Sequence, residues 1–171
     1  SQHIPLDSPW ISSEIPDELP PLPSIKDPSL EKQAFRHPAI LGEGPSYERL
    51  EWLGDAYLEV ISSCYILSTF PDLPSGRCSQ IRERLICNKQ LARYFRNYDL
   101  MPKAKIPVEV LHSEKTARGV SADKDLIKVQ ADMFEAYVGG LISSDPKCGV
   151  QTVCQWLKRV WGQTIKADVV S

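Results

Sequence analysis

Residues 46–70 read SYERLEWLGDAYLEVISSCYILSTF and form the strongest helical pattern in the chain. This stretch contains no proline, its one glycine is Gly54, and Pro71 and Pro74 follow its end. Because proline cannot continue a helix, we predict one long helix from Ser46 to Phe70. The predicted core stripe of this helix consists of Leu50, Leu53, Tyr57, Ile61 and Cys64.

Three carboxylates share one face of this predicted helix. Because each residue advances about 100° around a helix axis, Glu51 lies at about 300° and Asp55 at about 340° around the axis from Glu48. Like charges one turn apart destabilise a helix, and the residues that surround these acids are largely apolar. A divalent cation would compensate the repulsion, so the three acids are candidate metal ligands.

A second predicted helix, Asp125 to Ser143, carries another pair of acids. Asp132 and Glu135 are three residues apart, Lys128 precedes Asp132 by one turn, and all three share a face. Gly139 continues that face without a side chain that would obstruct an approaching backbone. The predicted core stripe opposite consists of Phe134, Val138 and Leu141. An Asp–x–x–Glu pair alone is usual on solvent-exposed helices, but two facing carboxylate clusters could hold one or two Mg²⁺ ions, which bind a phosphate and activate a water.

The rest of the chain also predicts helices and shows no strand alternation. Further helices are expected at Pro28–Phe35 (with Asp27 as N-cap), Ser79–Cys87, Asn88–Tyr98 and Gly149–Thr164. The segment Pro102–Lys124 lacks periodicity and is expected to be a loop. We therefore predict the all-α class and a helical bundle.

Length and composition are those of one globular domain. With 171 residues and 42% hydrophobic residues, the chain can bury a sizeable core. Because 7 of its 14 prolines lie in the first 28 residues, residues 1–24 are expected to form an extended, proline-rich arm. Residues 25–166 then form the domain, and residues 167–171 form a tail. No apolar run has the length of a membrane span, so no membrane partner is expected.

Charge is distributed unevenly along the chain. The net charge of −2 argues against a nucleic-acid binder, but residues 73–128 hold 12 basic and 6 acidic residues, whereas residues 1–72 hold 4 basic and 12 acidic ones. The middle of the chain could therefore present a basic surface. The five cysteines lack zinc-ligand spacing, and the three histidines form no metal or triad pattern, so we interpret both sets as incidental.

Two motifs resemble the ribonuclease III family. Residues 48–58 are similar to its signature, with Trp52 at the aromatic position, and residues 131–140 (ADMFEAYVGG) are similar to its second acidic motif. Between them, Phe70-Pro71, Ser75-Gly76 and Ser79 match the family in type and order. The resemblance covers about Leu22 to Lys158 and is greatest to fungal ribonuclease III and budding-yeast Dicer.

The resemblance implies a homodimeric endoribonuclease that hydrolyses double-stranded RNA with Mg²⁺, for which Mn²⁺ substitutes. Its products in RNA processing would carry 5′-phosphate and 3′-hydroxyl ends with short 3′ overhangs, and we expect an intracellular, nuclear location. The implied metal ligands are Glu48, Glu51, Asp55, Asp132 and Glu135. The implied catalytic residues are Asp55, Glu135 and Lys128, the lysine steadying a metal-bound water or the phosphate charge.

The resemblance also implies two contact surfaces. Trp52 matches an aromatic residue that lodges in the partner subunit, the alternative being a core position. Arg77, Arg82 and Lys89 are candidate contacts to RNA phosphates, although most surface arginines have no such role. Two further alternatives stay open: a non-catalytic relative that keeps only the fold, as in a ribosome-associated protein, and a Dicer-like enzyme that produces small RNAs of set length.

Overall fold

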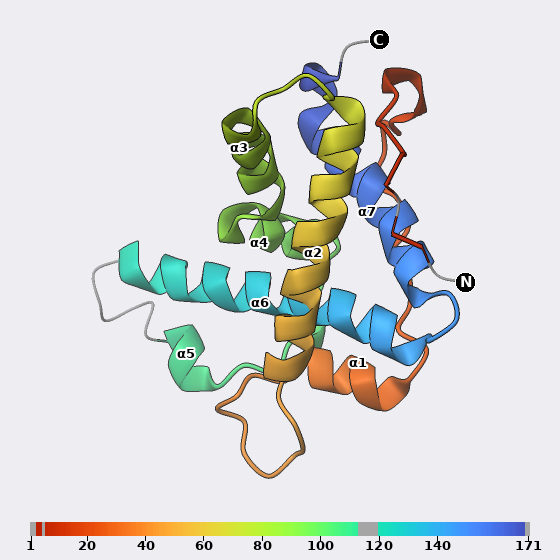
Figure 1. Cartoon of the computed structure of the whole chain (residues 1–171). Helices are drawn as coiled ribbons and strands as arrows, with labels where there is room; N and C mark the ends of the chain where they lie inside the picture. The colour runs from red at the N-terminus through yellow and green to blue at the C-terminus, as the bar shows by residue number, and fades with distance from the viewer. Residues whose placement is uncertain (1–2, 5, 113–119, 170–171) are drawn as a thin grey trace.

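Helices are the regular secondary structure of the described part of the chain. The computed structural model describes residues 3, 4, 6–112 and 120–169, and within them the one extended pairing is an isolated parallel bridge between Arg36 and Lys105 (Figure 1). The α-helices are α1 (Pro28–Ala34), α2 (Glu48–Thr69), α3 (Ser75–Ile86), α4 (Asn88–Asn97), α5 (Val108–His112), α6 (Val120–Ser144) and α7 (Gly149–Ile165). Short 3-10 turns lie at Ser12–Glu14, Met101–Lys103 and Lys166–Asp168. The predicted all-α class is confirmed, and none of the described helices is long and apolar enough to cross a membrane.

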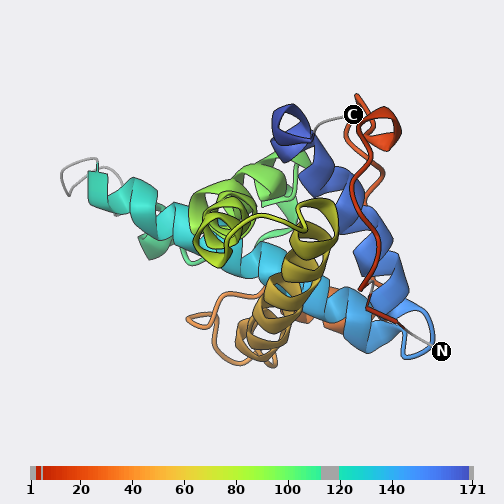
Figure 2. The same ribbon diagram turned by 45° about the horizontal axis from the view of Figure 1, so that its top comes forward.

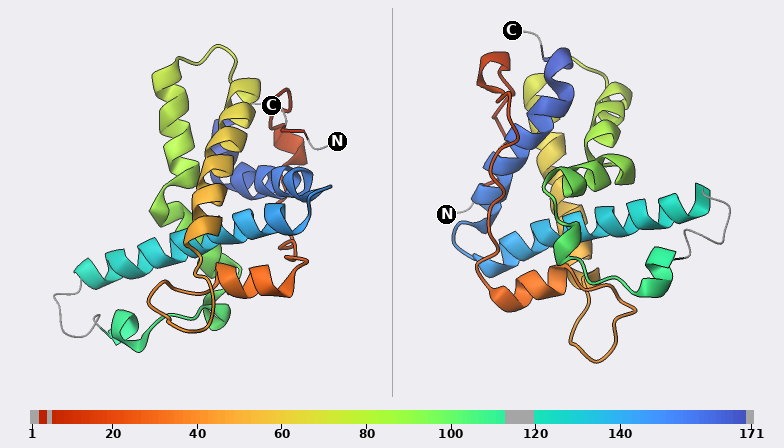
Figure 3. Two further views of the ribbon diagram at one scale, coloured as in Figure 1. Left: turned by 60° about the horizontal axis from the view of Figure 1, so that its bottom comes forward. Right: turned by 180° about the vertical axis from the view of Figure 1, so that it is seen from behind.

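Helix α6 forms the centre of the bundle. Every residue from 129 to 142 is buried, and helices α1, α2, α4 and α7 all contact α6 (Figures 1 and 3). A helix that is buried on all sides is apolar all round, which explains why the sequence of α6 shows little amphipathic contrast. The two charged side chains within that buried stretch, Asp132 and Glu135, are therefore exceptional.

Two glycines allow α2 and α6 to cross with their backbones in contact. A Cβ atom added at Gly54 would overlap the carbonyl oxygen of Glu135, and one added at Gly139 would overlap the carbonyl oxygen of Leu50. The distances from these Cβ atoms to the carbonyl oxygens would lie well under the 3.0 Å that real Cβ atoms keep from other atoms. Backbone atoms cannot move aside as the end of a flexible side chain can. The crossing therefore requires glycine at both positions, and it brings the acids of α2 close to those of α6.

The buried face of α2 differs from the predicted one. Its buried apolar side chains are Leu50, Leu58, Ile61, Tyr65 and Ile66. In contrast, Leu53, Tyr57 and Cys64 are only half-buried, so the predicted stripe is wrong at these positions. The core face is rotated by about 70° toward the acids, because α6 crosses α2 at Gly54 and turns that side inward.

One helix boundary and one loop also differ from expectation. Helix α3 begins at Ser75, directly after Pro74, and not at Ser79. The predicted loop Pro102–Lys124 contains α5 and the first turn of α6, although residues 113–119 of it lie outside the described part. A five-residue helix is too short to show periodicity in a sequence, which explains the missed α5.

The N-terminal arm lies along α7 and contributes to the core (Figure 2; Figure 3, right). The Trp10 ring packs on Tyr65 with 5.4 Å between ring centroids, and its Nε1 donates to the Lys158 carbonyl at 2.8 Å. Further along the arm, the carbonyl of Pro20 accepts a 2.6 Å hydrogen bond from the hydroxyl of Tyr98. Carbonyls without regular partners are thus satisfied by side chains of the domain.

Candidate metal centre

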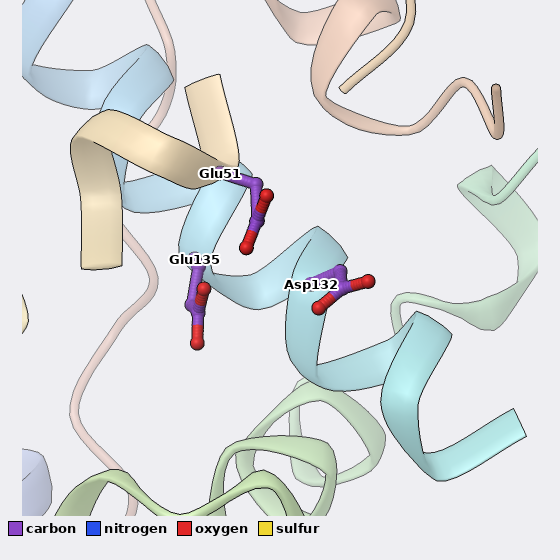
Figure 4. A group of neighbouring side chains, drawn as sticks. All are labelled: Glu51, Asp132 and Glu135. Carbon is purple, nitrogen blue, oxygen red and sulfur yellow. The ribbon is translucent and has the colours of Figure 1, made fainter. Parts of the chain in front are cut away.

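Three carboxylates from two helices converge at the crossing of α2 and α6. One oxygen each of Glu51, Asp132 and Glu135 lies within 4.8 Å of the other two (Figure 4). Asp132 and Glu135 are only 7% and 6% exposed, whereas Glu51 is half-buried at the edge of the core face. The close approach at Gly54 and Gly139 fixes this geometry, since any side chain there would move the helices apart.

The electrostatics of this cluster are unfavourable without a counter-charge. Burial raises the pKa of Glu135 to about 9, assisted by the negative charges of Asp55, Glu51 and Asp132. Burial also raises the pKa of Glu51, with Asp132 as the next cause. Carboxyl groups that are pushed toward the neutral form by one another are a suitable site for a divalent cation, which replaces the protons and removes the repulsion.

The other two predicted acids of α2 lie at the edge of the cluster. Asp55 is exposed, yet its charge is the largest electrostatic cause of the raised pKa of Glu135, so it acts on the same site. Glu48 is also exposed, and its Oε1 accepts a 3.2 Å hydrogen bond from the hydroxyl of Ser46. Among the described residues, the structure thus brings together three of the five predicted ligands and leaves these two outside the compact group.

Lys128 supplies a positive charge at the rim. Its Nζ lies 2.8 Å from Oδ2 of Asp132, one helical turn further along α6, and this hydrogen bond raises the pKa of the lysine. Because 65% of the Lys128 side chain is exposed, the ammonium group remains accessible from solvent. It could therefore contact an approaching phosphate while it stays near the carboxylates.

Tyr47 and His37 also lie at the site, although no sequence pattern indicates either residue. The hydroxyl of Tyr47 donates to Oδ2 of Asp132 at 3.2 Å, and burial raises its pKa, with the Asp132 charge as the next cause, so the phenol keeps its proton. The His37 ring stands edge-on to the Tyr47 ring at 6.0 Å between centroids, and burial lowers the pKa of His37. The structure thus places His37 beside the acidic cluster, a position that its interpretation as incidental did not anticipate. His37 lies in a connection without periodicity, and a tyrosine at the start of a helix is not distinctive.

An open cavity of about 430 Å³ adjoins the cluster on the side of α5. Its lining includes His37, Tyr47, Glu109, Asp125, Lys128 and Asp132. The tyrosine, the lysine and the aspartate therefore line a space that a hydrated ion or a phosphate group could enter.

The remaining predicted residues lie apart from the carboxylates. Arg77 and Lys89 are exposed on α3 and α4, while Arg82 is half-buried and donates to the hydroxyl of Ser63 at 2.9 Å. In the described part of the chain, no hydrogen bond or ion pair joins any of them to the acidic cluster. Trp52 is 77% exposed on α2, which rules out the alternative that it is a core residue of this chain.

A groove of about 650 Å³ lies beside Trp52. It is lined by Leu30, Gln33, Glu48, Arg49, Leu50, Trp52, Leu53 and Ser143. An exposed indole next to a partly apolar groove is unusual for the surface of a monomer.

Comparisons with known proteins agree with these features. The chain is 30% identical over 158 residues to the double-strand-specific pac1 ribonuclease of Schizosaccharomyces pombe, covering 82% of this chain and 39% of that protein. It is 29% identical over 134 residues to ribonuclease 3 of Limosilactobacillus reuteri, covering 75% and 54%. The chain thus spans about two fifths to just over half of the length of these relatives.

The fold has a solved counterpart, and a family description covers both acidic helices. The nuclease domain of ribonuclease III from Campylobacter jejuni superposes with a TM-score of 0.67 at 23% identity, covering 82% of this chain and 90% of that one. Residues 48–146 match the description "Ribonuclease III domain". This span extends over more than half of the chain and includes all five predicted acids, and on this ground the chain belongs to the ribonuclease III family.

Proposed function

We propose that this chain is the nuclease domain of a metal-dependent endoribonuclease that cuts double-stranded RNA. The observation that carries the proposal is the group of three carboxylates at a glycine-lined helix crossing, where burial raises the pKa of Glu135 to about 9. The names of its relatives as ribonucleases, one of them double-strand-specific, support the reaction and the substrate class.

The donor set fits Mg²⁺. Glu51, Asp132 and Glu135 offer hard oxygen ligands, and their mutual repulsion gives a divalent ion a larger gain than a monovalent one. When bound, Mg²⁺ (or Mn²⁺) supplies Lewis-acid activation of the phosphate and a water of lowered pKa. Asp55 adds negative charge at the edge of the site, and Lys128 stabilises negative charge on the phosphate from the rim.

We propose that basic side chains on α3 and α4 contact the backbone phosphates of duplex RNA. The exposed side chains of Arg77 and Lys89 are free to rotate toward a phosphate. Arg82 is a weaker candidate, because it would first have to leave its hydrogen bond with Ser63. Contacts of this kind read duplex shape more than sequence.

We also propose that the active form is a homodimer formed across α2. The exposed side of α2 presents Trp52, Val60 and Leu67. The groove beside Trp52 lies on the same side of the chain as the Trp52 indole, which would fill the equivalent groove of a second copy. In a two-fold dimer each Trp52 can enter the groove of the other subunit, so that the same surface patch of both subunits forms the interface. A relative supports this proposal, since the nuclease domain of ribonuclease III from Campylobacter jejuni has a flexible region involved in dimer formation.

Cleavage of defined substrates tests the proposed reaction. The chain is incubated with end-labelled duplex RNA, the matching single strand and the matching duplex DNA, with Mg²⁺, Mn²⁺ or a chelator. We expect metal-dependent cuts in the RNA duplex alone, with 5′-phosphate and 3′-hydroxyl ends and short 3′ overhangs. Glu135→Gln should abolish cutting, whereas Glu83→Gln, an exposed glutamate on α3, should not.

The same assay addresses the two alternatives. A dimer with intact acids that cuts no duplex at any protein concentration would favour a non-catalytic relative. Products of one sharp length from a long duplex would favour a Dicer-like enzyme, and a scatter of lengths would favour general RNA processing.

A further inference from the structure

Tyr47 connects the two helices that carry the carboxylates. Its backbone carbonyl accepts a 2.8 Å hydrogen bond from the amide of Glu51, which closes the first turn of α2. Its hydroxyl donates to Asp132 of α6, 85 residues further along the chain. One residue thus contacts a candidate ligand on each helix.

The position of Tyr47 is itself well fixed. The residue is 5% exposed, and its amide donates to the carbonyl of Arg36 at 2.9 Å. Its ring is held edge-on by the ring of His37. With only two side-chain torsions and a buried ring, its hydroxyl loses little further freedom when it binds a carboxylate.

Two donors converge on one oxygen of Asp132. Oδ2 receives both the Tyr47 hydroxyl and the Lys128 ammonium group, at 3.2 and 2.8 Å. A carboxylate oxygen has two lone pairs, so these two bonds occupy Oδ2. Within the described residues, no hydrogen-bond donor contacts the other oxygen, Oδ1, which is left for a different ligand.

The two donors are not equivalent. Lys128 has a long side chain that is 65% exposed, and its contact alone would leave the carboxylate free to turn. The Tyr47 hydroxyl belongs to a buried ring and defines one orientation of Asp132. Partners of this kind, which hold a ligand without touching the metal, tune metal affinity in many proteins.

We propose that Tyr47 is a positioning residue, which orients the Asp132 carboxylate toward the cation while its backbone fixes the turn that carries Glu51. This inference rests on the proposed function, because it assumes that the acidic cluster binds a divalent cation. Tyr47 itself contacts no metal or substrate in this account. Its removal should therefore weaken metal binding without unfolding the protein.

The test measures Mn²⁺ binding to the whole chain without RNA, by electron paramagnetic resonance of the free ion. Tyr47→Phe removes the hydroxyl and keeps the ring, and it should raise the Kd for Mn²⁺ by about 10-fold. Tyr65→Phe is the matched control, because it removes another buried tyrosine hydroxyl, which donates from α2 to the Cys154 carbonyl at 2.7 Å. The control should bind Mn²⁺ as the wild type does, and thermal unfolding should show that both variants fold.

A kinetic measurement adds a second readout. In duplex cleavage, Tyr47→Phe should raise the Mg²⁺ concentration that gives half-maximal rate by a similar factor. The rate at saturating Mg²⁺ and the KM for RNA should change much less. A residue with a purely structural role would not produce this selective dependence on metal.

The outcomes separate this inference from the proposed function. If Glu135→Gln loses Mn²⁺ binding but Tyr47→Phe binds as the wild type does, the role of Tyr47 is refuted and the metal site stands. Equal weakening in Tyr47→Phe and Tyr65→Phe also refutes it, because a general loss of rigidity would then suffice. If the wild type binds no Mn²⁺, both proposals fail.

Discussion

Replacing Glu135 by glutamine is expected to stabilise the metal-free protein at neutral pH. The folded protein holds the Glu135 proton up to a pKa of about 9, whereas the unfolded chain releases it near the ordinary value of 4.5. Between these values the folded state binds more protons, so the free energy of unfolding falls as the pH rises, by up to about 1.4 kcal/mol per pH unit. At pH 7 the loss would reach about 3 kcal/mol, which the variant avoids because glutamine cannot ionise.

Urea unfolding at pH 5, 6, 7 and 8 in the presence of a chelator measures this effect. The stability difference between Glu135→Gln and the wild type should grow steadily with pH. Comparing the two proteins cancels the opposite contribution of His37, whose lowered pKa makes the folded state gain stability as the pH rises through the range in which histidine titrates. A saturating concentration of Mg²⁺ should stabilise the wild type far more than the variant. A difference that is constant from pH 5 to pH 8 would refute the reasoning.

Three other substitutions, one of them with a matched control variant, test separate parts of the structure. Trp52→Ala should convert the dimer to monomer in light scattering, and an unchanged dimer would exclude Trp52 from the interface. Gly139→Ala should destabilise the protein by roughly 3 kcal/mol in urea unfolding, because its Cβ would overlap the Leu50 backbone. Gly76→Ala, with open space at the same atom, is the control and should be neutral or slightly stabilising. Lys128→Met should lower the single-turnover cleavage rate about 10-fold, and an unchanged rate would show that this charge is dispensable.

Helical spacing predicted much of the candidate site. It placed Glu51 on one helix face and Asp132 with Glu135 on another, and the structure brings these carboxylates within 4.8 Å of one another. It also identified Gly139 as a position where a backbone could approach. These features depend only on the spacing of residues along one helix, which can be read directly from the sequence.

Spacing could not predict which neighbour each face would meet. The buried face of α2 is set by α6 crossing at Gly54, a contact between residues far apart in the chain, and so the predicted stripe was misplaced. Tyr47 and His37 gain their importance from Asp132, which no local pattern reveals. The packing of the N-terminal arm could not be predicted for the same reason, because the burial of Trp10 depends on contacts with Tyr65 and α7.

Anomalous X-ray scattering from crystals grown with Mn²⁺ and a short RNA duplex tests the central claim most directly. We predict a manganese peak at the crossing of α2 and α6, coordinated by Glu51 of one helix and by Asp132 or Glu135 of the other, with a phosphate of the RNA beside it. A duplex bound without manganese at this crossing, or manganese bound only elsewhere on the protein, would contradict the account.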